Sequence, residues 1–115
     1  MNKVLLINTT SNKLIKVGIR IDGEEYVIKQ KIGHQKAQVV LPMIDKLLGQ
    51  HSLRLQDIQS IEVNARSGSF TGIRVGMSIA NALSFVLGIP IISFDSSARG
   101  GLAQDEGGDN IPTLI

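Results

Sequence analysis

Hydrophobic positions in the first third of the chain predict three consecutive strands. Residues 4–7 form a short, continuous apolar run, which is typical of a central strand buried on both faces. Across residues 15–21, apolar side chains alternate with lysine, glycine and arginine, the pattern of a half-exposed strand. Asp22 and Gly23 predict a tight hairpin turn, and residues 26–31 then form a return strand whose charged end suits a sheet edge. The sequence therefore predicts a three-stranded meander.

The apolar spacing changes to a helical period after Gly33. One face of this predicted helix carries Ala37, Val40, Met43 or Ile44, and Leu47. Gly49 is expected to end the helix. Pro42 either starts the regular part near its own position or kinks a longer helix, and the spacing leaves both alternatives open.

The second half of the chain predicts a strand, a helix and a further strand. Residues 60–64 alternate as a half-buried strand does, and residues 64–76 form a turn rich in glycine and hydroxyl groups. Residues 77–87 are apolar and small, as in a helix that Gly88 ends, and residues 90–94 form a buried strand. The complete order is β-β-β-α-β-α-β, which predicts an α/β fold, a mixed sheet with helices packed on it.

The glycine-rich turn is a candidate anion or nucleotide loop, because a helix that starts there directs free N–H groups and partial positive charge toward it. The residues of this candidate loop are Ser67, Gly68, Ser69 and Thr71. A Walker A loop ends in Gly-Lys-Ser/Thr, yet no lysine follows Lys46. The dinucleotide fingerprint needs two glycines separated by one residue, and the glycines here are four apart. The turn therefore matches neither of the sharper phosphate motifs.

Small residues recur at every fourth position from the turn into the helix. They are Gly68, Gly72, Gly76, Ala80 and Ser84. This spacing places them on one helix face, where another backbone can approach closely. Two interpretations stay open: the face packs on the chain's own helix or sheet, or it forms a helix–helix interface with a partner protein.

Residues 68–76, G-S-F-T-G-I-R-V-G, resemble the signature of the TsaB (YeaZ) family, whose members belong to the actin-like ATPase superfamily. His34 followed by residues 40–44, Asp57 before a strand, and residues 87–90 also resemble the family's order of features. The resemblance covers nearly all of this chain but about the first half of a usual member. It implies an actin-like (RNase H-like) N-terminal lobe over residues 1–110, with residues 111–115 as the start of a truncated second lobe.

The resemblance also implies a function. Family members are non-catalytic scaffold subunits that support threonylcarbamoyl transfer to adenosine in tRNA by forming a heterodimer with TsaD. The implied partners are a TsaD-like protein and a TsaE-like ATPase, with a homodimer as another pairing and tRNA contacted only through the complex. In the family, helices of this lobe form the dimer interface. The expected interface residues are Val40, Met43, Ile44, Leu47, Gly72, Arg74, Gly76, Ala80, Leu83 and Ser84.

Two alternatives are a nucleotide-binding actin-like ATPase lobe and a nonfunctional truncated fragment. Asn8 stands where actin-like ATPases commonly carry an aspartate near the metal and phosphates, and a neutral amide lacks the charge that a hard cation prefers. His34 and His51 lie at opposite ends of one helical segment, too far apart to share a metal. Ser67 and Ser69 have no identifiable base. We therefore expect no catalytic residue, metal or cofactor.

Composition narrows the class of protein further. The length of 115 residues is that of one domain, and the net charge of +2 is too small to indicate nucleic-acid binding. Cysteine is absent, which excludes disulfides and thiolate metal sites. No apolar run looks long enough to span a bilayer, so a cytoplasmic protein is the default expectation.

Overall fold

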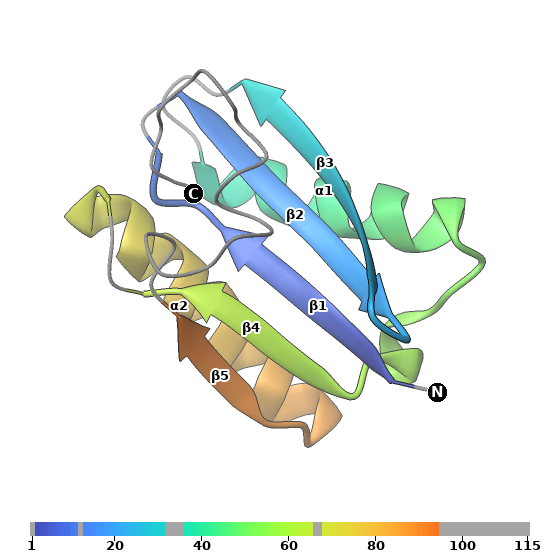
Figure 1. Ribbon diagram of the computed structural model, residues 1–115. Helices are drawn as coiled ribbons and strands as arrows, with labels where there is room; N and C mark the ends of the chain where they lie inside the picture. The colour runs from blue at the N-terminus through green and yellow to red at the C-terminus, as the bar shows by residue number, and fades with distance from the viewer. Residues whose placement is uncertain (1, 12, 32–35, 66–67, 95–115) are drawn as a thin grey trace.

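The strands and helices follow the order that the sequence predicts (Figure 1). The computed structural model of the chain describes residues 2–11, 13–31, 36–65 and 68–94. The elements are β1 (Lys3–Asn8), β2 (Leu14–Ile21), β3 (Glu24–Lys31), α1 (Lys36–Gln50), the 3-10 turn η1 (Leu55–Asp57), β4 (Ser60–Asn64), α2 (Phe70–Leu87) and β5 (Ile91–Phe94). The predicted boundary at residue 110 lies outside the described residues.

The five strands form one mixed sheet in the order β3-β2-β1-β4-β5. β1 pairs antiparallel with β2 and parallel with β4, so it lies at the centre. β3 continues the sheet beyond β2 as the antiparallel half of a hairpin, and β5 pairs parallel with β4 at the other edge. The hairpin turn places Asp22 at φ 50° and Gly23 at φ 93°, the left-handed conformations that a tight primed turn requires. The predicted meander is therefore confirmed.

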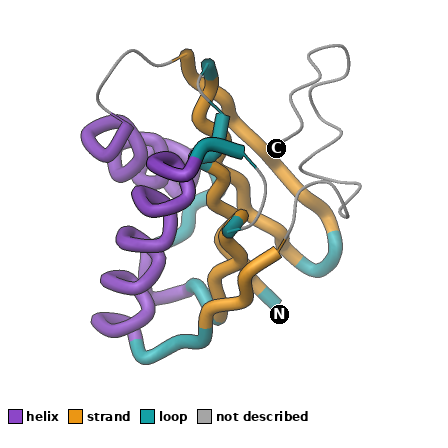
Figure 2. Tube along the Cα trace, turned by 90° about the vertical axis from the view of Figure 1, so that its left-hand side faces the viewer, coloured by secondary structure: helices purple, strands orange, loops and turns teal. Residues whose placement is uncertain are grey.

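Both helices cover the same face of the sheet, and the main core lies between the two layers (Figure 2). Leu5 and Ile7 of β1 point into this core. Val4 and Leu6 point to the opposite face, where they pack with Phe94 of β5. β1 is thus buried on both faces, as its continuous apolar run predicts.

Helix α1 buries its apolar face against the sheet, which corrects part of the expected partner interface. The four residues expected at that interface are each no more than 3% exposed: Val40, Met43, Ile44 and Leu47. They belong to the chain's own core, because the sheet needs an apolar layer over it. Pro42 lies inside the helix and on its exposed side, so the longer-helix alternative is the correct one.

Helix α2 begins at Phe70 and includes much of the glycine-rich stretch, whereas the sequence predicts a turn as far as Gly76. Ser69 is the N-cap residue, and its hydroxyl oxygen accepts a hydrogen bond from the Gly72 N–H. Gly88 ends the helix in the left-handed conformation, at φ 68°, as predicted.

The small-residue face of α2 packs on the sheet, which decides between the two interpretations of that face. Gly72, Gly76 and Ala80 are buried. A Cβ atom added at Gly76 would lie 2.6 Å from the Thr9 Oγ1 atom and 3.3 Å from a methyl carbon of Val63. The face therefore lets the helix backbone approach β1 and β4, and the expectation that these three residues contact a partner is wrong.

By length and composition alone, α2 could cross a membrane, contrary to the expectation from the sequence. Its 18 residues have a mean hydropathy of 1.4. A core helix of a soluble protein meets the same two criteria. The small-residue face of α2 packs on β1 and β4, and 17% of the helix is buried inside the structure.

Candidate functional site

A buried polar cluster lies where β1 and β4 end, beside the start of α2. The side-chain oxygen of Asn8 accepts hydrogen bonds from the Thr10 N–H at 3.2 Å and from the Thr10 hydroxyl at 2.8 Å. The Asn64 side-chain amide donates to the same Asn8 oxygen at 3.3 Å and to the Thr10 hydroxyl oxygen at 3.1 Å. Asn8 therefore joins the two strand ends and caps the turn after β1.

The candidate anion loop is closed against this cluster. The Ser69 N–H donates to the Thr10 carbonyl oxygen at 2.8 Å. Gly68 has φ 111°, and an added Cβ there would lie 2.5 Å from the Thr10 Cβ atom. Since the Gly72 N–H already bonds to the Ser69 hydroxyl oxygen, two N–H groups that could bind a phosphate are used inside the chain. Thr71 is exposed, and Ser67 lies outside the described residues.

Large apolar side chains are exposed at both ends of α2 and on α1. The exposed fractions are 72% for Phe70, 88% for Phe85 and 76% for Val86 on α2, and 52% for Leu41 on α1. We call these four residues together with Arg74 the outer helix face. Exposed groups of large apolar side chains are typical of interaction surfaces, whereas single ones are common on any protein.

Arg74 is the one exposed residue among the ten expected interface residues, all of which the structure describes. The carbon at the centre of its guanidinium lies 5.6 Å from the centre of the Phe70 ring, within the range of a cation–π contact. Both residues line a cavity of about 470 Å³ that also includes Ala37 of α1 and Ser78 of α2. Arg74 thus lies beside the seam between the two helices.

The other two expected residues on α2 are half-buried and contribute to the chain's own fold. Leu83 packs against the main core. The Ser84 hydroxyl donates to the Ile89 carbonyl oxygen, just after the helix ends. These contacts leave Leu83 and Ser84 only partly available to a partner.

Helical periodicity could have identified the outer helix face. At 3.6 residues per turn, Phe70, Arg74 and Phe85 lie roughly opposite the face that carries Gly72 and Gly76. In α2 the small residues face the sheet, and several large ones face outward. The small-residue face is the stronger local pattern, and the large residues opposite it follow from the same period.

Within the described ranges, no group of three or more histidine, aspartate or glutamate residues could hold a metal ion. The ring of His51 packs on Tyr26, with 4.5 Å between the ring centres. His34 lies outside the described residues. His51, the one histidine among the described residues, therefore packs on an aromatic ring in the connection between α1 and η1.

The central β1, the parallel pairing with β4 and β5, and the helices on one face define the class of protein as an actin-like, RNase H-like lobe. A family model described as TsaD: tRNA N6-adenosine threonylcarbamoyltransferase matches residues 25–106. The chain belongs to this family and, within it, to the TsaB (YeaZ) group, as its signature predicts.

Individual relatives support the same assignment. The tRNA threonylcarbamoyladenosine biosynthesis protein TsaB of Haemophilus influenzae is 34% identical over 91 residues, which cover 79% of this chain and 39% of the relative. The Bacillus subtilis protein of the same name is 32% identical over 96 residues, covering 81% and 41%. The structure of YeaZ from Pseudomonas aeruginosa matches with a TM-score of 0.79 at 26% identity, covering 85% of this chain and 46% of that one. The chain spans less than half the length of each.

Proposed function

We propose that this chain is a non-catalytic subunit in the synthesis of threonylcarbamoyladenosine in tRNA, and that it forms a heterodimer with a TsaD-like protein through the outer helix face. We infer the reaction from the relatives, which are named as threonylcarbamoyladenosine biosynthesis proteins. The exposure of Phe70 and Phe85 on one side of α2 is the observation that supports the contact. A TsaE-like ATPase is a further partner, tRNA is bound through the complex, and the site of action is the cytoplasm.

The size of the apolar surface supports an association between proteins. Fully burying a side chain such as leucine, valine or phenylalanine contributes about 1.5–3 kcal/mol. Four such side chains together contribute at most roughly 6–12 kcal/mol, against an association cost of about 4–15 kcal/mol. Because these ranges overlap, the loss of one exposed phenylalanine should weaken the complex strongly.

Isothermal titration calorimetry with the TsaD-like protein of the same organism tests the proposal. Phe85→Ser should raise the Kd at least tenfold, which corresponds to about 1.4 kcal/mol. Circular dichroism should show an unchanged fold, because Phe85 contributes little to the core. Ile92→Ser is the matched control, because Ile92 is exposed on β5 and faces away from the helices. Absence of binding by the unmodified chain, or equal binding by Phe85→Ser, would refute the proposal.

The closed turn supports the scaffold function over the nucleotide-binding alternative. A lobe that binds nucleotide should release heat when ATP and magnesium are added, whereas the proposal expects no binding, since Ser69 and Gly72 donate within the chain. A homodimer through the outer helix face is the competing pairing. Sedimentation of the chain alone, compared with Phe85→Ser, distinguishes it from the heterodimer.

A further inference from the structure

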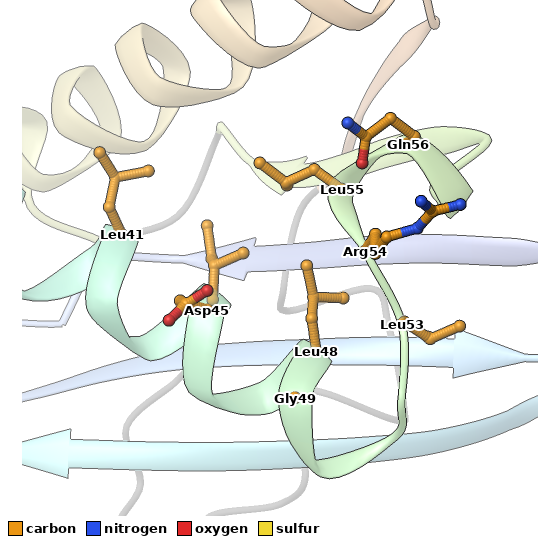
Figure 3. Close-up of a pocket in the computed structure, with 9 residues that line it drawn as sticks. Leu41, Asp45, Leu48, Gly49, Leu53, Arg54, Leu55 and Gln56 are labelled. Atoms are coloured by element: carbon orange, nitrogen blue, oxygen red, sulfur yellow. The ribbon is translucent and has the colours of Figure 1, made fainter.

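An apolar groove lies beside the carboxyl-terminal half of α1 (Figure 3). Leu41, Ile44 and Leu48 of α1 line one side, and Leu53 and Leu55 from the connection to β4 line the other. Its volume is about 490 Å³, within the roughly 300–1,000 Å³ that is usual for ligand sites. We call it the α1 groove.

Two charged residues of opposite sign stand on the rim of the α1 groove. Asp45 extends from α1, and Arg54 extends from the connection that leads to η1 (Figure 3). Arg20 forms ion pairs with Glu25 and Glu62, and neither rim charge is found in an ion pair with another described residue. A wholly apolar occupant that covered one of these charges would take it out of water without compensation, at a cost of several kcal/mol.

Asp45 and Arg54 restrict the chemistry of a bound molecule to different degrees. Asp45 has a short side chain on α1, one turn from both Leu41 and Leu48, so a molecule that covers these leucines also covers the carboxylate. Arg54 has a long, flexible stem, and its guanidinium can stay in water while the stem covers apolar surface. A cation opposite Asp45 is therefore the stricter requirement.

The length of the floor favours a polypeptide. From Leu41 to Leu48 the helix advances about 10 Å at 1.5 Å per residue. Side chains three or four residues apart on a helix are about 5–6 Å apart, so a single short segment can place an apolar side chain on the floor and a charge at Asp45. This is the pattern by which amphipathic segments bind in grooves.

We propose that the α1 groove binds a segment of another protein, in which a large apolar side chain fills the floor and a neighbouring lysine or arginine pairs with Asp45. The groove shares Leu41 with the outer helix face, but its wall of Leu53 and Leu55 lies outside that face. The inference therefore goes beyond the proposed heterodimer and does not depend on it.

A random peptide display library selected on the immobilised full chain tests this proposal. Enriched peptides should combine a bulky apolar residue with lysine or arginine three or four positions away. Their Kd should rise at least tenfold for Leu55→Lys and for Asp45→Lys. Selection on Asp45→Lys should instead enrich glutamate or aspartate at the charged position, because the preferred sign reverses.

Matched controls separate the groove from a general surface effect. Lys46→Glu reverses a charge next to Asp45 on a residue that does not line the groove, and Val86→Lys places a lysine on an exposed apolar position of α2. Both should bind the selected peptides as the unmodified chain does. No enrichment, or peptides that bind Leu55→Lys and Asp45→Lys unchanged, would overturn the proposal. So would a dimer of the chain that Leu55→Lys abolishes, since the occupant would then be a second copy.

Discussion

Replacing Gly76 with alanine should destabilise the chain, although alanine is the better helix former. In the interior of a helix, glycine costs about 0.8–1.0 kcal/mol relative to alanine. At Gly76 this gain is opposed by the sheet beneath α2, because the new Cβ would lie 2.6 Å from the Thr9 Oγ1 atom and 3.3 Å from a methyl carbon of Val63. The gain in helix propensity and the clash with the sheet change the free energy of unfolding in opposite directions. The sign of the measured change shows which effect is larger.

The surroundings of Thr9 make the steric effect the larger one. Thr9 is completely buried, and its hydroxyl donates a hydrogen bond to the Gly72 carbonyl oxygen in α2. Moving this side chain away would lose a hydrogen bond of about 0.5–1.5 kcal/mol. Overpacking a close-packed interior costs about 1–3 kcal/mol. After subtracting the helical gain, we expect Gly76→Ala to lower the free energy of unfolding by about 1–3 kcal/mol.

Urea denaturation followed by far-ultraviolet circular dichroism measures this loss. Gly49→Ala in α1 is the matched control, because an added Cβ there meets no atom within 4 Å. It should raise the free energy of unfolding by about 0.5–1 kcal/mol. A double-mutant cycle with Thr9→Ala should show a favourable coupling of about 1 kcal/mol, since removing Oγ1 makes room for the new methyl group.

Two outcomes would refute this reasoning. If Gly76→Ala is as stable as the unmodified chain or more stable, contact with the sheet does not limit the size of residue 76. If the effects of Thr9→Ala and Gly76→Ala are additive, the clash with Thr9 is not the cause of the loss.

Three further predictions follow from individual contacts. Gly88→Ala should lose about 1 kcal/mol of stability in urea denaturation, because the left-handed conformation at φ 68° strains alanine although no neighbour obstructs its Cβ; an unchanged midpoint would contradict this. Glu62→Gln should cost about 1 kcal/mol in urea denaturation by weakening the largely buried pairing with Arg20; an unchanged midpoint would contradict this. The hydrogen bond to Glu24 raises the pKa of Tyr26 above its ordinary value of 10.0, so this bond adds stability below pH 10 that is lost as the pH rises through the folded-state pKa. Absorbance titration of this single tyrosine should give a lower pKa in Glu24→Gln, and an identical pKa would exclude the proposed cause.

Much of the fold could be predicted from local patterns. The hairpin turn is an example, because Asp22 and Gly23 are residue types that tolerate the left-handed backbone that the turn requires. The sequence places the start of α2 after Gly76, whereas the helix begins at Phe70. The glycines are typical of a turn, but Ser69 caps the helix before them. The buried cluster of Asn8 and Asn64 joins residues far apart in sequence, and no local pattern indicates it.

The sequence by itself determined which residues share a helix face and which strands are buried on both sides, because side-chain periodicity is a local property of the backbone. The tertiary structure decided what each face touches. Gly72, Gly76 and Ala80 pack on the chain's own strands, and the large residues on the opposite side of α2, such as Phe85, lie in solvent. The physical reason is that periodicity does not encode the distance between α2 and the sheet. That distance follows from the parallel crossover between β4 and β5, which brings the helix backbone onto β1 and β4.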